Sequence, residues 1–122
     1  MSNKISTREA YGRALAEIGS DKKIVVLEAD LSCCTMTKYF QDRYPERFFN
    51  IGIAECNMVG IGAGLALCGK KVFVNSFAMF SAGRAFEQIR NSIAYPNLNV
   101  TIIGSHAGIT VGKDGATHQC LE

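Results

Sequence analysis

The fold is indicated most clearly by residues 48–69, which read FFNIGIAECNMVGIGAGLALCG. The apolar start of this stretch predicts a short buried strand, Gly52 permits a tight turn, and the small residues that follow predict a helix. Glu55 falls in the first turn of that helix, just beyond the end of the strand. Because open α/β sheets bind ligands at the carboxyl ends of their strands, this acid is a candidate site residue.

Glu55 has two interpretations. A carboxylate near a helix N-terminus is commonly a solvated partner of the helix dipole. The sequence neighbours of Glu55 are nevertheless mostly apolar and include no Lys or Arg. Such surroundings would desolvate the carboxyl group and raise its proton affinity, as happens in catalytic acids and bases.

Three glycines, Gly60, Gly62 and Gly64, lie inside the predicted helix. Each costs about 1 kcal/mol relative to alanine, which indicates that another backbone packs closely on this helix. The dinucleotide pattern G-x-G-x-x-G would need a glycine at Leu65, so the run does not match it. We therefore expect close helix packing here, either within the chain or across a subunit interface.

Strands and helices alternate along the rest of the chain. Apolar runs predict further strands at 23–29, 71–75 and 99–105, and helices are expected at 7–19, 36–44 and 82–95. This order with short connections predicts a three-layer α/β sandwich, a mostly parallel sheet with helices on both faces. Ser6 and Glu9 have capping-box spacing at the first helix. The inward positions are expected to be Ala10, Tyr11, Ala14, Leu15 and Ile18 in the first helix, and Ala85, Phe86, Ile89 and Ile93 in the last.

Composition sets limits on the class of protein. The chain has 122 residues, 48% of them hydrophobic, which is enough for one domain with a core. A net charge of +2, with lysine pairs beside strands, disfavours binding to nucleic acid or membrane surfaces. No run of 18 apolar residues predicts a membrane span, and residues 1–7 lack the apolar core of a signal peptide. Five cysteines, an odd number without C-x-x-C, favour a reduced cytoplasmic protein with free thiols.

Several polar and aromatic residues follow the predicted strands and are expected to gather at one edge of the sheet. The fourth strand leads into a glycine-rich segment, 106–118, that begins and ends with the only two histidines of the chain. Two histidines and an acid in one such loop favour a polar site, although no third ligand has metal-binding spacing. The gathered residues are Asp30, Glu55, Phe77, Phe80, His106, Asp114 and His118.

Some of these residues also have a purely structural interpretation. Asp30 is equally typical of a turn cap, the two phenylalanines of a core, and a single histidine of a structural role. Arg8 lies in the first turn of a helix, where the dipole disfavours a cation, and on sequence alone it is typical of a solvated surface residue.

Three motifs in this order resemble the pyrimidine-binding domain of transketolase, and the resemblance covers nearly the whole chain. They are GIAECNM at 52–58, the Phe77/Phe80 pair, and GKDGATHQ at 112–119. The variant looks like the C-terminal subunit of a split transketolase. Deoxyxylulose-phosphate synthases and pyruvate dehydrogenase-type subunits share the glutamate, whereas the THQ ending is closer to transketolase.

The resemblance implies thiamine diphosphate and a divalent metal, Mg²⁺ or Ca²⁺. Glu55 matches the glutamate that bonds the ring nitrogen of the aminopyrimidine and so promotes loss of the thiazolium proton. Phe80 matches the aromatic residue that stacks on the pyrimidine, Phe77 a second wall of that pocket, and Asp30 an acid close to the cofactor.

The resemblance also implies substrate contacts. His106 and His118 match histidines that contact the sugar and its carbonyl oxygen, so that with Glu55 they form the expected catalytic set. Asp114 matches an acid that reads a sugar hydroxyl. Arg8 matches an arginine that holds the sugar phosphate, which reverses the interpretation from sequence alone.

Three positions depart from the family pattern. Cys34 stands where transketolases commonly carry a serine for the sugar phosphate, which puts that contact in doubt. Gly83 stands where some members have a further aromatic residue, and Cys56 where Gln, Ala or His is more usual.

The family's Gly-Asp-Gly…Asn-Asn segment for metal and diphosphate is missing from the chain, which ends at Glu122 where the family's domain would continue. We therefore expect residues 1–122 to be a single pyrimidine-binding-type domain, incomplete at its C-terminal end and without a metal site of its own. A second subunit would supply the diphosphate-binding domain and the metal, and a homodimer or higher assembly is expected.

The expected function is part of a transketolase of the pentose phosphate pathway, which transfers a two-carbon ketol unit between sugar phosphates and is inactive as this chain alone. Alternatives are a deoxyxylulose-phosphate synthase-like or other thiamine diphosphate enzyme subunit, a nucleotide- or flavin-binding module, and a non-catalytic homologue. The absence of a phosphate-cradling loop after the first strand argues against the nucleotide module, and the presence of Glu55, His106 and His118 against the non-catalytic homologue.

Overall fold

The computed structural model describes residues 4–121 and contains a parallel sheet of four strands in the order β2-β1-β3-β4. The strands are β1 (Ile24–Glu28), β2 (Phe48–Asn50), β3 (Lys71–Phe77) and β4 (Val100–Ser105). In register, Val26 of β1 lies opposite Phe48 of β2 and Phe73 of β3. The predicted α/β sandwich with a parallel sheet is confirmed.

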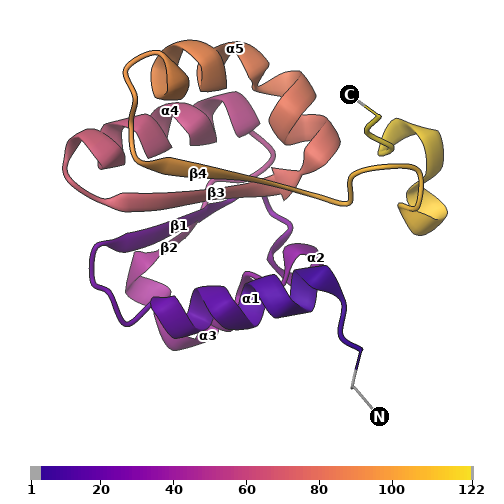
Figure 1. Cartoon of the computed structure of the whole chain (residues 1–122), viewed down its shortest axis with the longest axis horizontal. Coiled ribbons are helices and arrows are strands. Elements are labelled where there is room, and N and C mark those ends of the chain that lie inside the picture. Colours follow the sequence, from indigo (N-terminus) through magenta and orange to yellow (C-terminus); the bar gives the residue numbers. More distant parts are fainter. Residues whose placement is uncertain (1–3, 122) are drawn as a thin grey trace.

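Helices cover both faces of this sheet (Figure 1). On one face lie α1 (Thr7–Ile18), α2 (Ser32–Thr35) and α3 (Lys38–Arg43), and on the other lie α4 (Glu55–Leu67) and α5 (Phe86–Gln88). Two π-helical turns, Met79–Arg84 and Ile89–Ala94, flank α5, and 3₁₀ turns span Pro45–Arg47 and Gly112–Thr117. No helix within residues 4–121 has the length and apolar character needed to cross a membrane.

The core has two halves, one on each face of β1. Side chains of β1 alternate between the faces, so that Val25 and Leu27 pack toward α4 while Ile24 and Val26 pack toward α1 and α3. All five residues of β1 are buried, as its continuous apolar run predicts. The expectation of a buried strand here holds only for Phe48. Phe49, which is 46% exposed, and Asn50 are exposed because β2 is the edge of the sheet.

Helix α1 begins as predicted but turns a different face inward. The Ser6 hydroxyl accepts a hydrogen bond from the amide of Glu9 at 3.3 Å. The buried positions include Gly12 and Ala16, whereas three expected inward residues, Ala10, Ala14 and Ile18, are exposed. Gly12 decides this face, because a Cβ at that position would collide with the backbone carbonyl of Met36.

The three glycines of α4 have different surroundings. Gly62 faces the sheet, where a Cβ would come within 3.0 Å of Val74. At Gly60 and Gly64 a Cβ would meet no described atom within 4 Å. The expected close packing therefore occurs inside the chain at Gly62, while Gly60 and Gly64 leave an open strip on the outer side of the helix.

The helical segment after β3 starts earlier than predicted. Phe77 is the last residue of β3, and the π turn at Met79–Arg84 follows almost directly. Because a π turn holds an extra residue, it rotates the side chains that follow it. As a result Ala85 and Ile93 are buried as expected, but Phe86 is 62% exposed, which corrects its predicted inward position.

Candidate functional site

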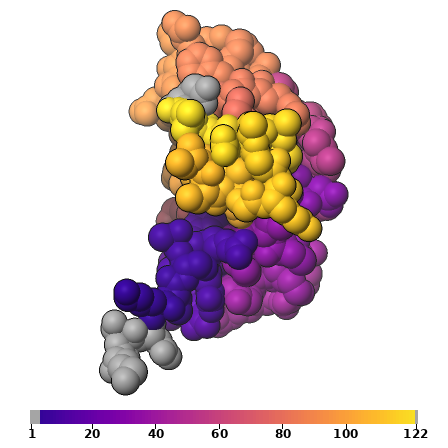
Figure 2. Space-filling model, turned by 90° about the vertical axis from the view of Figure 1, so that its right-hand side faces the viewer, coloured from indigo at the N-terminus to yellow at the C-terminus, as the bar shows by residue number. Residues whose placement is uncertain are grey.

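The predicted site residues lie at the carboxyl ends of the strands, where the C-terminal segment covers the edge of the sheet. In Figure 2 this segment lies between the N-terminal helix and the helical segment after β3. An isolated bridge between Gly108 and Cys120 closes it into a loop.

Four aromatic rings from three separate parts of the chain meet at this edge. The ring centroids of Phe77 and His106 lie 4.3 Å apart, and those of Phe77 and Phe80 6.4 Å apart in a stacked arrangement. The ring of His118 stands edge-on to both phenylalanines, at 5.9 Å from Phe77 and 5.2 Å from Phe80. The structure thus brings the two phenylalanines and the two histidines together, as the strand order predicts.

Both histidines are oriented by a neighbouring hydroxyl group. Nδ1 of His106 lies 2.7 Å from the Ser105 hydroxyl, and Nδ1 of His118 lies 2.8 Å from the Thr117 hydroxyl. Burial lowers the pKa of His106, the cation of Arg8 lowers it further, and Asp114 acts in the opposite direction. The lowered pKa favours the neutral form of the His106 ring, in which one nitrogen donates and the other accepts a hydrogen bond.

The carboxylate of Glu55 is almost completely covered, with 2% of its side chain exposed. Its Oε1 accepts a hydrogen bond from the Ser76 hydroxyl at 3.3 Å, and its Oε2 pairs with Nη1 of Arg84 at 2.7 Å. The burial contradicts a solvated partner of the helix dipole. The sequence neighbours of Glu55 include no cation, but the fold brings in Arg84 from 29 residues away.

Arg84 also connects Glu55 to the aromatic rings. Its guanidinium carbon lies 4.7 Å from the centre of the Phe80 ring, in a cation–π contact. Neither Arg84 nor Ser76 was predicted. Ser76 lies near the end of β3 and Arg84 ends the π turn that follows, so the sequence placed both after the third predicted strand. The contact of Arg84 with Glu55 depends on the direction in which the π turn orients its last side chain.

Asp30 takes part in a separate polar contact. It has a positive φ of 65°, and its amide donates to Oδ1 of Asn50 at 3.0 Å. The Asn50 amide nitrogen donates back to Oδ1 of Asp30 at 2.8 Å, and the same Oδ1 of Asn50 accepts from the amide of Gly52 at 3.0 Å. Asn50, which sequence reasoning missed, thus ties the end of β1 to the turn that precedes Glu55. This supports the turn-capping interpretation of Asp30, and its cofactor role stays a prediction.

A cleft of about 770 Å³ lies between the start of α1 and the end of β4. Arg8, Tyr11, Ser105 and His106 are among the residues that line it. Arg8 donates to the backbone carbonyl of Cys34 at 3.4 Å, so the cysteine contributes its backbone to this contact rather than its thiol.

A buried acid beneath this cleft was not predicted as part of the site. The side chain of Glu28 accepts hydrogen bonds from the hydroxyl groups of Thr35 at 2.8 Å and Thr37 at 2.5 Å, and Thr35 lines the cleft. Burial raises the pKa of Glu28 to about 6, although these hydrogen bonds act in the opposite direction. Tyr11, which also lines the cleft, donates from its hydroxyl group to Oδ1 of Asn75 at 2.5 Å.

Within residues 4–121, no group of three or more His, Cys, Asp or Glu side chains is arranged to hold a metal ion. All five cysteines are unpaired.

Comparison with known proteins identifies the family. The model of the family "Transketolase, pyrimidine binding domain" matches residues 3–122. The "Putative transketolase C-terminal section" of Methanocaldococcus jannaschii is 58% identical over 116 residues, which cover 94% of this chain and 37% of that protein. Human "Transketolase" is 41% identical over 122 residues, which cover 98% of this chain and 19% of that protein.

Solved structures agree with the sequence relatives. A protein described as "Split gene transketolase, inactive beta4 tetramer" superimposes with a TM-score of 0.78 at 60% identity, covering 87% of this chain and 36% of that chain. Transketolase from Campylobacter jejuni gives a TM-score of 0.86 at 26% identity, covering 96% of this chain and 19% of that chain. The chain thus spans 37% or less of the length of these relatives. From the family match over nearly all of its length, the chain belongs to the transketolase family, in the part that forms the pyrimidine-binding domain.

Proposed function

We propose that this chain forms the pyrimidine half of a thiamine diphosphate site in a transketolase that transfers a two-carbon ketol unit between sugar phosphates. The observation that carries the proposal is that one guanidinium, that of Arg84, contacts both the buried Glu55 carboxylate and the Phe80 ring at the carboxyl edge of the sheet. When bound, thiamine diphosphate supplies the nucleophilic carbon that carries the two-carbon unit.

The residues present fit an aminopyrimidine ring. Such a ring is flat, has hydrogen-bond donors on its edge and needs an acidic partner at a ring nitrogen. The guanidinium of Arg84 has the same flat shape and edge donors, and it already binds the carboxylate of Glu55 and covers Phe80. This pair of contacts supports roles for Glu55 in holding a proton at the ring nitrogen and for Phe80 in stacking.

We assign sugar phosphate binding to the neighbouring cleft. Arg8 would hold the phosphate, and His106 would contact the substrate oxygen atoms, since both line the cleft. His118 and Asp114 would complete the contacts to the sugar. In support, His118 packs against the same Phe77 as His106 does, and the charge of Asp114 acts on His106. A neutral His106 suits hydrogen bonding to a carbonyl or hydroxyl oxygen.

We further propose that a second subunit completes the site. It would carry the diphosphate-binding domain and Mg²⁺ or Ca²⁺, while the present chain supplies one pyrimidine-binding-type domain. Similarity to a protein described as a C-terminal section supports this division. Association with further copies is supported by the open strip at Gly60 and Gly64 and by the tetramer named for the split-gene relative. The assembled enzyme would act in the cytoplasm, in the pentose phosphate pathway.

Replacement of Glu55 by glutamine tests the central role, because glutamine keeps the size of the side chain but cannot exchange a proton in this way. In the complex with the partner subunit, we expect deuterium exchange at the thiazolium carbon of bound cofactor to slow by about 10²–10⁴-fold. The melting temperature should change little, since the half-exposed Arg84 can be solvated when its partner is neutral. Glu17→Gln on the exposed side of α1 serves as the matched control. Exchange within about threefold of the parent, less than 1 kcal/mol of barrier, would refute the role.

A further inference from the structure

We propose that Arg84 gates the pyrimidine half-site: its guanidinium binds both groups assigned above to the aminopyrimidine and must leave them before such a ring can enter. This inference rests on the proposed function and goes further, because it gives the site a closed state built from its own chain.

The gate is visible in the contacts of Arg84. One nitrogen lies 2.7 Å from Oε2 of Glu55, and the guanidinium carbon lies 4.7 Å from the centre of the Phe80 ring. The side chain of Glu55 is 2% exposed, whereas that of Arg84 is 46% exposed. Arg84 is therefore the part of this contact that can move into solvent, and its movement would uncover the carboxylate.

The backbone at Arg84 is held in place, so the movement belongs to the side chain. Arg84 ends the π turn Met79–Arg84, and its carbonyl accepts a hydrogen bond from the thiol of Cys56 at 3.3 Å. The next residue, Ala85, is fully buried. A long side chain on a fixed backbone, with its charged end half-exposed, can turn outward without any change in the fold.

The closed state lowers the free energy of the chain when no ligand is bound. A buried carboxylate without a partner is strongly unfavourable, and the guanidinium neutralises it in a flat, hydrogen-bonded contact. A ligand that binds only the open state loses apparent affinity in proportion to the open fraction. If one molecule in about ten is open, the apparent dissociation constant rises about tenfold, equivalent to about 1.4 kcal/mol.

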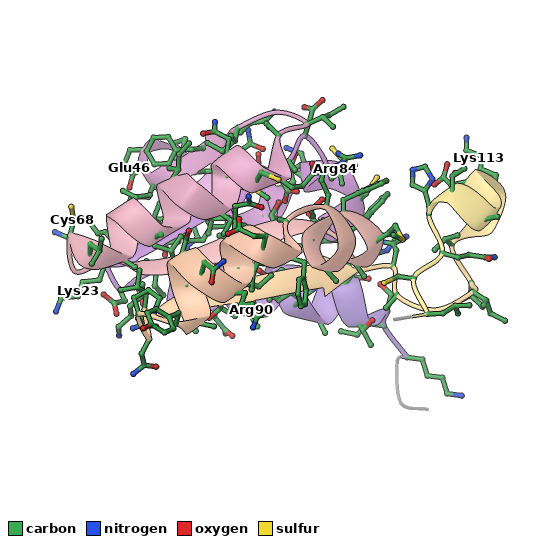
Figure 3. All side chains as sticks on the ribbon, turned by 90° about the horizontal axis from the view of Figure 1, so that it is seen from above. Lys23, Glu46, Cys68, Arg84, Arg90 and Lys113 are labelled. Carbon is green, nitrogen blue, oxygen red and sulfur yellow. The ribbon has the colours of Figure 1, made fainter. Side chains whose placement is uncertain are left out.

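Figure 3 shows why Arg90 is a suitable control for Arg84. Both arginines come from the helical segment after β3, but Arg84 points to the end that carries the C-terminal segment and Arg90 lies farther along. Arg90 is exposed, and its side chain forms no ion pair or cation–π contact with residues 4–121. Replacing either arginine by methionine removes one positive charge, so a difference between the two variants reports on the gate rather than on net charge.

The experiment titrates the 122-residue chain with the neutral probe 4-amino-5-hydroxymethyl-2-methylpyrimidine and follows binding by NMR. We expect Arg84→Met to bind the probe about tenfold more tightly than the parent, and Arg90→Met to bind like the parent. In the parent, the Nε–Hε signal of Arg84 should move toward that of a solvated arginine as the probe binds. This signal needs no substitution, so it tests the gate even if Arg84→Met is unstable, which a melting curve would show.

The outcomes separate the gate from the function beneath it. If Arg84→Met binds the probe like the parent, and Glu55→Gln abolishes binding in both, the half-site is real and the gate is refuted. A parent Arg84 signal that stays unchanged when the probe is bound refutes it as well. If Glu55→Gln leaves probe binding to Arg84→Met unchanged, the proposed function fails and the gate with it. If no variant binds the probe at millimolar concentration, removing Arg84 does not open a site on this chain and the gate alone is refuted.

Discussion

Replacement of Glu28 by glutamine should remove a pH dependence from the stability of this chain. Glu28 is fully buried at the end of β1, and burial raises its pKa from an ordinary 4.5 to about 6. Between these two values the folded chain keeps a proton that the unfolded chain has lost, so the stability falls as the pH rises. A difference of 1.5 pKa units corresponds to about 2 kcal/mol.

Burial sets the direction of the pKa shift, and the groups that face Glu28 only reduce its size. The hydroxyl groups of Thr35 and Thr37 and the amide of Ala29 donate to its carboxylate, and no ion pair with Glu28 is formed within residues 4–121. Tyr11, whose pKa is raised by its own burial and by the charge of Glu28, stays protonated. The stabilisation from protonated Glu28 is thus complete below pH 4.5 and is lost as the pH rises through about 6.

The assay is urea unfolding of parent and Glu28→Gln at about pH 4 and about pH 7.5. The other titrating groups are common to both chains, so the difference between the chains isolates Glu28. We expect the stability of Glu28→Gln relative to the parent to rise by about 2 kcal/mol between these pH values. Thr37→Val, which removes the donor of the 2.5 Å hydrogen bond, should steepen the pH dependence instead. A relative stability that changes by less than about 0.5 kcal/mol, or that falls, would refute the reasoning.

Four further predictions test the packing and the assembly. Gly64→Ala should stabilise the chain by about 0.5–1 kcal/mol in urea unfolding, because the added methyl group meets open space. Gly62→Ala should stabilise it less, or destabilise it, because the methyl group is crowded by Val74. Equal effects would contradict the assigned faces of α4. Arg47→Met should cost about 2–4 kcal/mol by the same assay, since Arg47 donates to three backbone carbonyls, and a loss below about 0.5 kcal/mol would show that solvent replaces it. Calorimetry of this chain alone with thiamine diphosphate and Mg²⁺ should give a dissociation constant weaker than about 1 μM, and tighter binding would argue against a divided site. Gly64→Leu should weaken self-association through the open strip of α4 in sedimentation, and a parent chain that remains monomeric at high concentration would rule that strip out.

The main elements of the fold were predictable because local patterns are sufficient to specify them. The continuous apolar run of β1 predicts a strand buried on both faces, and Gly52 with its positive φ marks the turn before α4. Ser6 indicates the start of α1 through its hydrogen bond to Glu9. The meeting of Phe77 with His106 was also predictable, since the carboxyl ends of parallel strands share one edge.

The remaining features depend on contacts between distant residues, which no local pattern encodes. The partner of Glu55 is Arg84, which lies 29 residues away and is oriented by the π turn that it ends. The same turn leaves Phe86 exposed, although its spacing is typical of an inward residue. Only the packed structure distinguishes Gly62 from Gly64 on α4, because the sheet lies on one side of the helix. The pKa of Glu28 likewise depends on its burial and on the hydroxyl groups of Thr35 and Thr37, which flank the left-handed Met36. The raised pKa of this acid at the end of a strand was therefore decided only by the tertiary structure.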